Sequence, residues 1–131
     1  AAAFPLVARA GGAARPRVGG RIAFVPTPGH SPDHAALVLA AGDDYACFSG
    51  DLLHSPLQFA HPQWNSAFCG DPRQAEVSRR EMMAWGASHH AQWFTGHFAG
   101  PSCGWLEKDK QGDYRWREAG KQAADKGNSD E

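Results

Sequence analysis

Three strand-like segments of this chain each lead to a glycine that is followed at once by a side chain able to bind a metal. These dipeptides are GH at 29–30, GD at 50–51 and GH at 96–97. Glycine has no Cβ, so it permits a tight backbone turn that aims the next side chain inward. Side chains at strand ends are held by the sheet, while the adjoining loops admit a ligand. We therefore expect a sheet whose strand ends converge at one edge.

The hydrophobic pattern around these dipeptides predicts a small α+β domain with a mainly antiparallel sheet and one long helix. Strands are expected at 21–25, at 34–40 and 45–50 as a largely buried hairpin, at 91–96, and as a second hairpin within 104–118. The turn of that second hairpin should lie near 110–112. Residues 51–70 contain two prolines and no clear period, so we expect a long loop with one helical turn.

The start of the long helix is indicated by Asp71, Pro72 and Gln74. The aspartate can cap the helix, proline suits its first position, and the glutamine completes a capping box. The helix should run to about His89, with an apolar line of Ala75, Met82 and Trp85 packed in the core and its charged residues left in solvent.

Composition divides the chain into three regions and excludes several classes of partner. Residues 1–17 are rich in alanine and glycine and are expected to be flexible, 18–117 form the domain, and 118–131 form a polar tail. The 13 basic and 14 acidic residues give a net charge of -1, which argues against nucleic acid or a membrane surface as partner. Three dispersed cysteines, with no apparent signal peptide or membrane span, favour the cytoplasm.

Converging strand ends would bring together His30, Asp51 and His97. Two imidazole nitrogens and one carboxylate suit a catalytic zinc, which takes three protein ligands and leaves one position for water. Such a metal would lower the pKa of water and polarise a carbonyl or phosphoryl oxygen. The alternative for each histidine is an ordinary solvated or hydrogen-bonded loop residue.

Three motifs, "TPGHSPDH", "FSGDLLH" and "FTGHFAGP", resemble in order and spacing the second half of the metallo-β-lactamase superfamily. The stretches "GDLLHSPLQFAHPQW", "FCGDPRQA" and "GDYRW" are similar to its branch containing methyl parathion hydrolase and related organophosphate and lactone hydrolases. The resemblance implies that His30 binds one metal, His97 binds another and Asp51 bridges them. It places His34 as a residue that orients the ligands.

The family's HxHxDH motif, which supplies four further ligands, has no counterpart in the sequence. The resemblance therefore implies half of the family's αββα sandwich, with one or two metals per site: zinc, or another divalent ion such as Mn²⁺, Fe²⁺ or Co²⁺. His54, His61, His89 and His90 could be recruited as additional ligands, although the first two suit ordinary loop residues and the last two suit a helix end.

Half of a sandwich would leave one sheet face without a partner. The apolar side chains expected there include Phe24, Leu37 and Phe48. Because a patch of this kind exceeds what a soluble monomer usually exposes, we expect two copies to pair as a homodimer that rebuilds a two-sheet core.

The sequence thus predicts a metal-dependent hydrolase of small esters, with phosphodiesters or phosphotriesters as the leading substrates. One alternative is a lactone or carboxyl-ester hydrolase of the same fold. Another is a non-catalytic fragment that oligomerises and binds metal incidentally, and a third is a subunit completed by a chain that carries HxHxDH.

Overall fold

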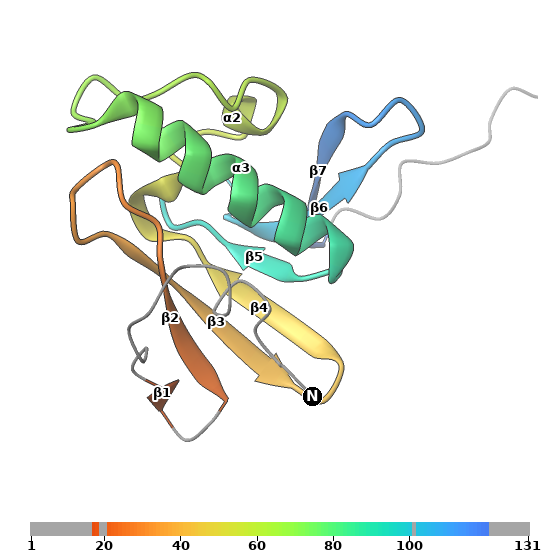
Figure 1. The fold of residues 1–131 in the computed structure, drawn as a ribbon. Coiled ribbons are helices and arrows are strands. Elements are labelled where there is room, and N and C mark those ends of the chain that lie inside the picture. Colours follow the sequence, from red (N-terminus) through yellow and green to blue (C-terminus); the bar gives the residue numbers. More distant parts are fainter. Residues whose placement is uncertain (1–16, 19–20, 101, 121–131) are drawn as a thin grey trace, which may run out of the picture.

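The computed structural model describes residues 17–18, 21–100 and 102–120, which form one sheet crossed by a long helix (Figure 1). The expectations for 1–16 and 121–131 lie outside these residues. The elements in chain order are β1 (Arg17–Val18), β2 (Ile22–Pro26), β3 (Ala35–Ala41), β4 (Asp44–Phe48), the 3-10 helix η1 (Gly50–Leu52), α2 (Leu57–Ala60), α3 (Pro72–Ser88), β5 (Gln92–Phe94), β6 (Cys103–Lys108) and β7 (Tyr114–Glu118).

The strands lie in the sheet in their sequence order, and all neighbours are antiparallel except β4 and β5. Parallel neighbours need a crossover connection, and here the chain from 49 to 91 makes it through η1, α2 and α3. This confirms the expected mainly antiparallel sheet with a long helix. It also means that β4 and β5 end at the same edge of the sheet.

Both predicted hairpins are present, as β3 with β4 and as β6 with β7. The expectation that β3 and β4 would be largely buried is wrong, because only alternate residues are. Ala36, Val38 and Ala40 of β3 are buried, whereas the intervening leucines are half-buried. The period-2 alternation of a strand places these two sets on opposite faces, and α3 covers only one of them.

The helix α3 begins as the sequence predicts, since the Asp71 side chain accepts a hydrogen bond from the Gln74 N–H at 3.1 Å. The second half of the expected capping box is not formed. The Asp71 N–H donates instead to the Gly29 carbonyl at 2.7 Å, so it is not available to the side-chain oxygen of Gln74. The start of the helix is thereby fastened to the loop between β2 and β3.

The core lies between α3 and one sheet face. Met82 and Met83 of the helix are fully buried, as are Val38 and Trp93 of the strands. Gly86 permits this approach, because a Cβ there would lie 2.7 Å from the Trp93 ring. The segment from 51 to 70 contains the expected helical turn as the short helix α2, and it also contains the end of η1.

The other sheet face is apolar, and its side chains follow from the strand register. One row across the sheet consists of Phe24, Leu37, Phe48, Phe94 and Cys103. Phe48 stacks on Phe94 with ring centroids 4.8 Å apart, and the exposed fractions of Phe24 and Phe48 are 37% and 41%. This face matches the expected second face of half a sandwich.

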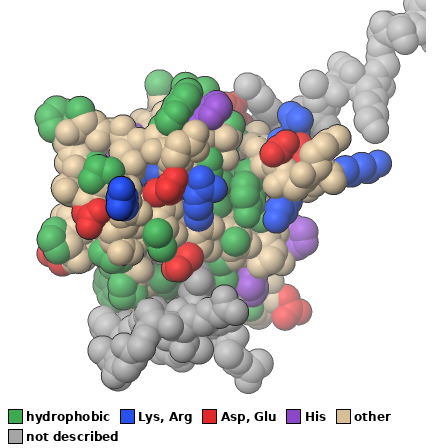
Figure 2. All heavy atoms as spheres, turned by 45° about the horizontal axis from the view of Figure 1, so that its top comes forward, with side chains coloured by type: hydrophobic (Ala, Val, Ile, Leu, Met, Phe, Trp, Pro, Cys, Tyr) green, Lys and Arg blue, Asp and Glu red, His purple; other side chains and the backbone are tan. Residues whose placement is uncertain are grey.

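Side chains of both charge signs are scattered among hydrophobic ones on the helix side of the molecule (Figure 2). This agrees with the small net charge of the chain. In the described part of the chain, no helix has the length and apolar character needed to cross a membrane.

Candidate metal centre

Asp51 occupies the start of η1, directly after β4. Gly50 before it has φ 54°, a left-handed conformation that glycine adopts without strain. A Cβ at Gly50 would also lie 3.0 Å from His34 Nε2. The glycine therefore lets the chain turn sharply enough to present the carboxylate at the sheet edge.

His97 follows β5 and reaches the same carboxylate from the neighbouring strand. Its Nε2 lies 2.7 Å from Asp51 Oδ1, at hydrogen-bonding distance. The two side chains meet because β4 and β5 are parallel, and the register is continued beyond the strands by the Ser49 N–H donating to the Phe94 carbonyl at 3.1 Å.

His30 comes from the loop between β2 and β3, and its Nε2 lies 3.8 Å from Asp51 Oδ2. That loop is packed tightly on α3, since a Cβ at Gly29 would lie 2.2 Å from the Ala75 nitrogen. The Ser78 hydroxyl also donates to the Pro28 carbonyl at 2.8 Å. The loop that carries His30 is therefore held in place by α3, which begins at Pro72, more than forty residues later in the chain.

His54 is a third imidazole beside Asp51, with its Nε2 3.6 Å from Oδ1. Its ring lies between the other two, with centroids 5.2 Å from His30 and 5.0 Å from His97. One ligand atom from each of His30, Asp51 and His54 can be chosen so that all lie within 4.8 Å of one another. The structure thus gathers three imidazoles around a single carboxylate.

His34 lies next to this cluster but uses both ring nitrogens for hydrogen bonds. Its Nε2 accepts from the Asp51 N–H at 2.9 Å, so the proton belongs on Nδ1, which lies 2.8 Å from the Thr27 hydroxyl. Such a residue fixes the backbone of a ligand rather than serving as one. This geometry fits the orienting role that the sequence resemblance implies.

The other histidines considered from sequence lie elsewhere. His61 stacks on Trp64 with ring centroids 4.0 Å apart, and His89 stacks on Trp85 at the end of α3. His90, with φ 51°, lies in the turn that follows the helix. In the described part of the chain, none of the three joins a group of side chains that could hold a metal.

The electrostatics of the cluster favour an ionised carboxylate. Partial burial raises the pKa of Asp51, but the hydrogen bond with His97 and the nearby His30, His97 and His54 rings outweigh this and lower the pKa below its usual range. Burial, together with the neighbouring His97 and His30, lowers the pKa of His54. A charged oxygen therefore faces histidines, of which His54 is held toward its neutral, metal-binding form.

Two buried polar residues that the sequence analysis did not single out support this edge. Gln58 accepts from the His54 N–H at 2.6 Å, and its amide donates to the Trp64 carbonyl at 2.9 Å. Arg79 of α3 donates to the carbonyls of Leu52, at 3.0 Å, and Pro62. Arg79 lies four residues after Ala75 and three before Met82, so helical spacing alone could have placed it on the buried face.

The donor set fits a divalent transition metal. Imidazole nitrogen and carboxylate oxygen are the ligands that zinc and its neighbours accept. The Nδ1 atoms of His30 and His54 are buried and have no hydrogen-bond partner among the described residues. The exposed fractions of the Asp51 and His97 side chains are 40% and 48%, so the carboxylate is open to solvent on the His97 side.

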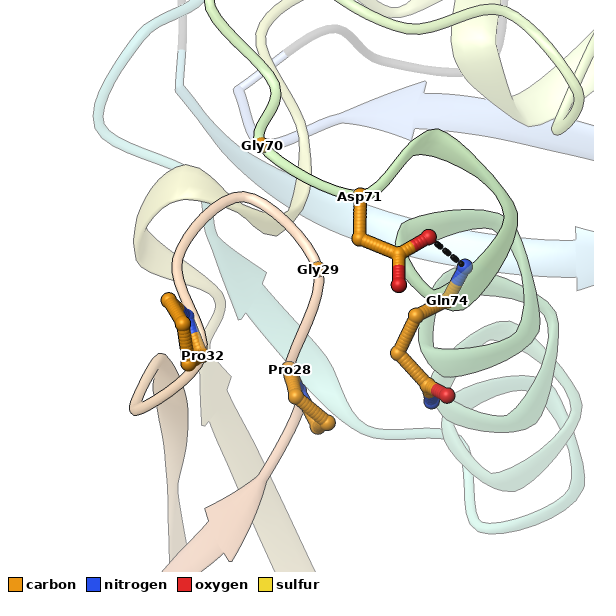
Figure 3. A pocket seen from close by; sticks show the side chains of 6 residues that line it. All are labelled: Pro28, Gly29, Pro32, Gly70, Asp71 and Gln74. Atoms are coloured by element: carbon orange, nitrogen blue, oxygen red, sulfur yellow. Dashed lines mark hydrogen bonds between the residues drawn. The ribbon is translucent and has the colours of Figure 1, made fainter.

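A separate hollow of about 410 Å³ lies where the loop between β2 and β3 meets the start of α3 (Figure 3). It is lined by Pro28, Gly29, Pro32, Gly70, Asp71 and Gln74. None of the four side chains of the cluster lines this hollow, and the Asp71 carboxylate is already engaged in capping α3.

No family model and no curated protein matches the sequence, but solved structures do match the fold. The dizinc quorum-quenching lactonase AidC, in complex with N-hexanoyl-L-homoserine, matches at TM-score 0.71 and 25% identity over 82% of this chain and 36% of its own. AbOPH, a hydrolase of the β-lactamase superfamily, matches at TM-score 0.70 and 24% identity over 77% and 35%. A probable metal-dependent hydrolase from Staphylococcus aureus matches at TM-score 0.69 and 16% identity over 82% and 39%.

These similarities show that the chain has a partial metallo-β-lactamase fold and that its structural neighbours are metal-dependent hydrolases. The chain spans little more than a third of the length of each neighbour. The comparisons do not single out the methyl parathion hydrolase-like branch that the sequence motifs resemble.

Proposed function

We propose that this chain is a metal-dependent hydrolase of small esters, with phosphodiesters and phosphotriesters as its leading substrates. The observation that carries the proposal is the convergence of His30, His54 and His97 on the Asp51 carboxylate at an open edge of the sheet. The hydrolases found among the structural neighbours support the reaction class.

In this proposal His30, Asp51 and His97 hold the metal, with zinc as the first candidate and Mn²⁺, Fe²⁺ or Co²⁺ as alternatives. When bound, the metal supplies Lewis acidity and lowers the pKa of water toward neutrality. The protein's own part is to fix these side chains: His34 holds the Asp51 backbone, and α3 holds the His30 loop. One or two ions per site are compatible with this donor set.

The open setting of the site favours esters with good leaving groups. With 48% of its side chain exposed, His97 does not close the carboxylate off from solvent. Aryl phosphodiesters and phosphotriesters need little help for the departing aryloxide, which suits such a site.

A second candidate function is hydrolysis of lactones or carboxyl esters. It is favoured by the similarity to AidC, which is described as a lactonase and is 25% identical over 82% of this chain. A non-catalytic fragment that binds metal incidentally is the remaining alternative.

The test is hydrolysis by the zinc-loaded full chain of a bis-aryl phosphodiester, an aryl phosphotriester and an N-acyl homoserine lactone, each with and without chelator. We expect phosphoester hydrolysis that chelation and Asp51→Ala abolish. Asp44→Ala, an exposed acid at the far end of the same strand, should leave it unchanged. Turnover of the lactone alone would favour the second function, and phosphoester hydrolysis that survives both chelation and Asp51→Ala would refute the proposed site.

We also propose that two copies of the chain pair through the apolar sheet face. Two outward rows cross strands β2 to β5 without a charged residue: Phe24, Leu37, Phe48 and Phe94 form one, and Ile22, Leu39, Ala46 and Gln92 form the other. The second row continues through Trp105 to Arg117 of β7, whose charge is paired with Glu107. Two such faces can therefore meet without burying an unpaired charge.

Light scattering across a range of concentrations tests the dimer. We expect the wild type to dimerise and Phe24→Lys to prevent it, whereas Val77→Lys on the outer side of α3 should have no effect. A wild type that stays monomeric, or a Phe24→Lys variant that still dimerises, would contradict this pairing.

The dispersed free cysteines support the further proposal of a reducing, cytoplasmic setting.

A further inference from the structure

Two of the three imidazoles around Asp51 stand at a distance that a hydrogen bond does not explain. The His97 contact of 2.7 Å is a hydrogen bond, but His54 Nε2 lies 3.6 Å from Oδ1 and His30 Nε2 lies 3.8 Å from Oδ2. Both separations exceed the usual range for a nitrogen donor and an oxygen acceptor. These two histidines face the carboxylate closely without bonding to it.

The spacing agrees with that of ligands around one ion. Ligand atoms about 2.0–2.2 Å from a tetrahedral zinc lie roughly 3.3–3.6 Å from one another. The gaps from His54 and His30 to the carboxylate are close to this value, whereas the His97 gap is too short for it. Of the described side chains, those whose ligand atoms can all lie within 4.8 Å of one another are His30, Asp51 and His54.

We propose that His54 is a direct ligand, so that His30, Asp51 and His54 hold a divalent transition metal with donors from this chain alone. This inference rests on the proposed function of the same site and adds His54 to the ligands named there. His97, which is hydrogen-bonded to the carboxylate in this structure, stays the proposed ligand on the open side.

The protein holds the backbone of His54 with buried polar groups. Gln58, only 5% exposed, accepts from the His54 N–H at 2.6 Å and from the Ser55 N–H at 3.2 Å. Arg79, only 2% exposed, fastens the chain on both sides of His54 through the carbonyls of Leu52 and Pro62. Burying an amide and a guanidinium costs free energy, which a loop with a merely solvated histidine would not need.

The same network fixes where the ring can go. Arg79 also donates to Asn65 Oδ1 at 2.9 Å, so the segment from Leu52 to Asn65 is fastened to α3 at three points. The His30 loop is fastened to the start of the same helix through Gly29 and Asp71. One helix therefore sets the spacing between His54 and His30, and Gln58 and Arg79 act as positioning residues.

Zinc titration followed by calorimetry on the full chain tests this inference with a readout that needs no turnover. We expect about one zinc per chain for the wild type, an affinity at least tenfold weaker for His54→Gln, and no binding for Asp51→Ala. His61→Gln is the matched control, because His61 lies in the same loop, stacks on Trp64 and is absent from the cluster. It should bind zinc as the wild type does.

Imidazole nitrogen chemical shifts of the ¹⁵N-labelled protein keep the inference testable if His54→Gln folds poorly. Adding zinc should change the ¹⁵N chemical shift of one ring nitrogen in His30 and of one in His54. Wild-type affinity in a folded His54→Gln variant, or a shift at His30 with none at His54, would overturn the role of His54 while leaving the proposed hydrolase site intact. A wild type that binds no zinc would overturn both proposals.

Discussion

Two aspartates at opposite ends of the molecule have a lowered pKa for different reasons. Asp109, in the turn between β6 and β7, accepts from the Gln111 and Asp113 N–H groups at 2.9 Å and from Arg115 Nε at 3.0 Å. Its hydrogen bond with Asp113 leads the causes that lower its pKa. Asp51 is ionised among imidazoles, of which only His97 lies within hydrogen-bonding distance.

The difference separates a carboxylate that stabilises a turn from one that can take a ligand. The bonds of Asp109 are made to its own hairpin, which leaves its charge satisfied locally. Asp51 faces two histidines across gaps too long for hydrogen bonds, with His54 at 3.6 Å from Oδ1 and His30 at 3.8 Å from Oδ2. A lowered pKa alone would not tell these sites apart, whereas the number and length of their contacts does.

The largest expected effect comes from replacing each aspartate by alanine in turn and comparing the zinc affinities of the two variants. Asp51→Ala should abolish zinc binding, because it removes the one charged donor of the site. Asp109→Ala should leave zinc binding unchanged. Calorimetric titration of both variants is the measurement, and equal zinc affinities for the two would remove the distinction drawn between them.

The next effect concerns the support of the Asp51 edge by Arg79. The Arg79→Met substitution leaves the carbonyls of Leu52 and Pro62 without their hydrogen-bond donor. We expect it to lower the free energy of unfolding by about 2–4 kcal/mol. Denaturant unfolding measures this change, and zinc affinity should fall with it.

Arg80→Met is the matched control for that variant. Arg80 is exposed and pairs with Glu76 at 3.3 Å one helical turn away, a contact worth about 0.3–0.5 kcal/mol. If the two arginine variants lost similar stability, the support assigned to Arg79 would be wrong.

The smallest effect is the stability that Asp109 gives its hairpin. Its pKa is lower in the folded than in the unfolded chain, so its contribution is present above the unfolded value of about 3.9 and is lost as pH falls through the folded value. The melting temperature of Asp109→Ala should therefore lie slightly below that of the wild type at neutral pH, and the gap should close in acid. Thermal scans at several pH values measure this, with the exposed Asp113→Ala as control; a gap that widened in acid would contradict the assignment.

The parts of the fold that could be predicted are those encoded over short distances. An alternating pattern indicated β2, continuous apolar runs indicated β3 and β4, and the Asp71 cap was visible within four residues. The partner that replaced Gln74 in the capping box was not visible, because the Gly29 carbonyl lies more than forty residues earlier in the chain. Nor could strand patterns reveal that a single helix covers only one face of the sheet.

The same limit applies to the site. The glycine turns identified His30, Asp51 and His97 as side chains that would converge, and the structure brings them together; their roles as ligands stay predictions. His54 lies in a loop with no periodic pattern, so the sequence could not place its ring, which the structure puts with Nε2 3.6 Å from Asp51 Oδ1. His61, seven residues later in the same loop, was an equal candidate from sequence and stacks on Trp64 instead.

The central claim is that a metal is held by histidine and carboxylate ligands around Asp51, and zinc K-edge X-ray absorption of the zinc-loaded full chain tests it most directly. We predict a first shell of nitrogen and oxygen alone at about 2.0–2.2 Å, with the outer-shell scattering of at least two imidazoles. A sulfur shell at about 2.3 Å, which would assign the metal to cysteines such as Cys69 or Cys103, or a protein that retains no zinc, would contradict it.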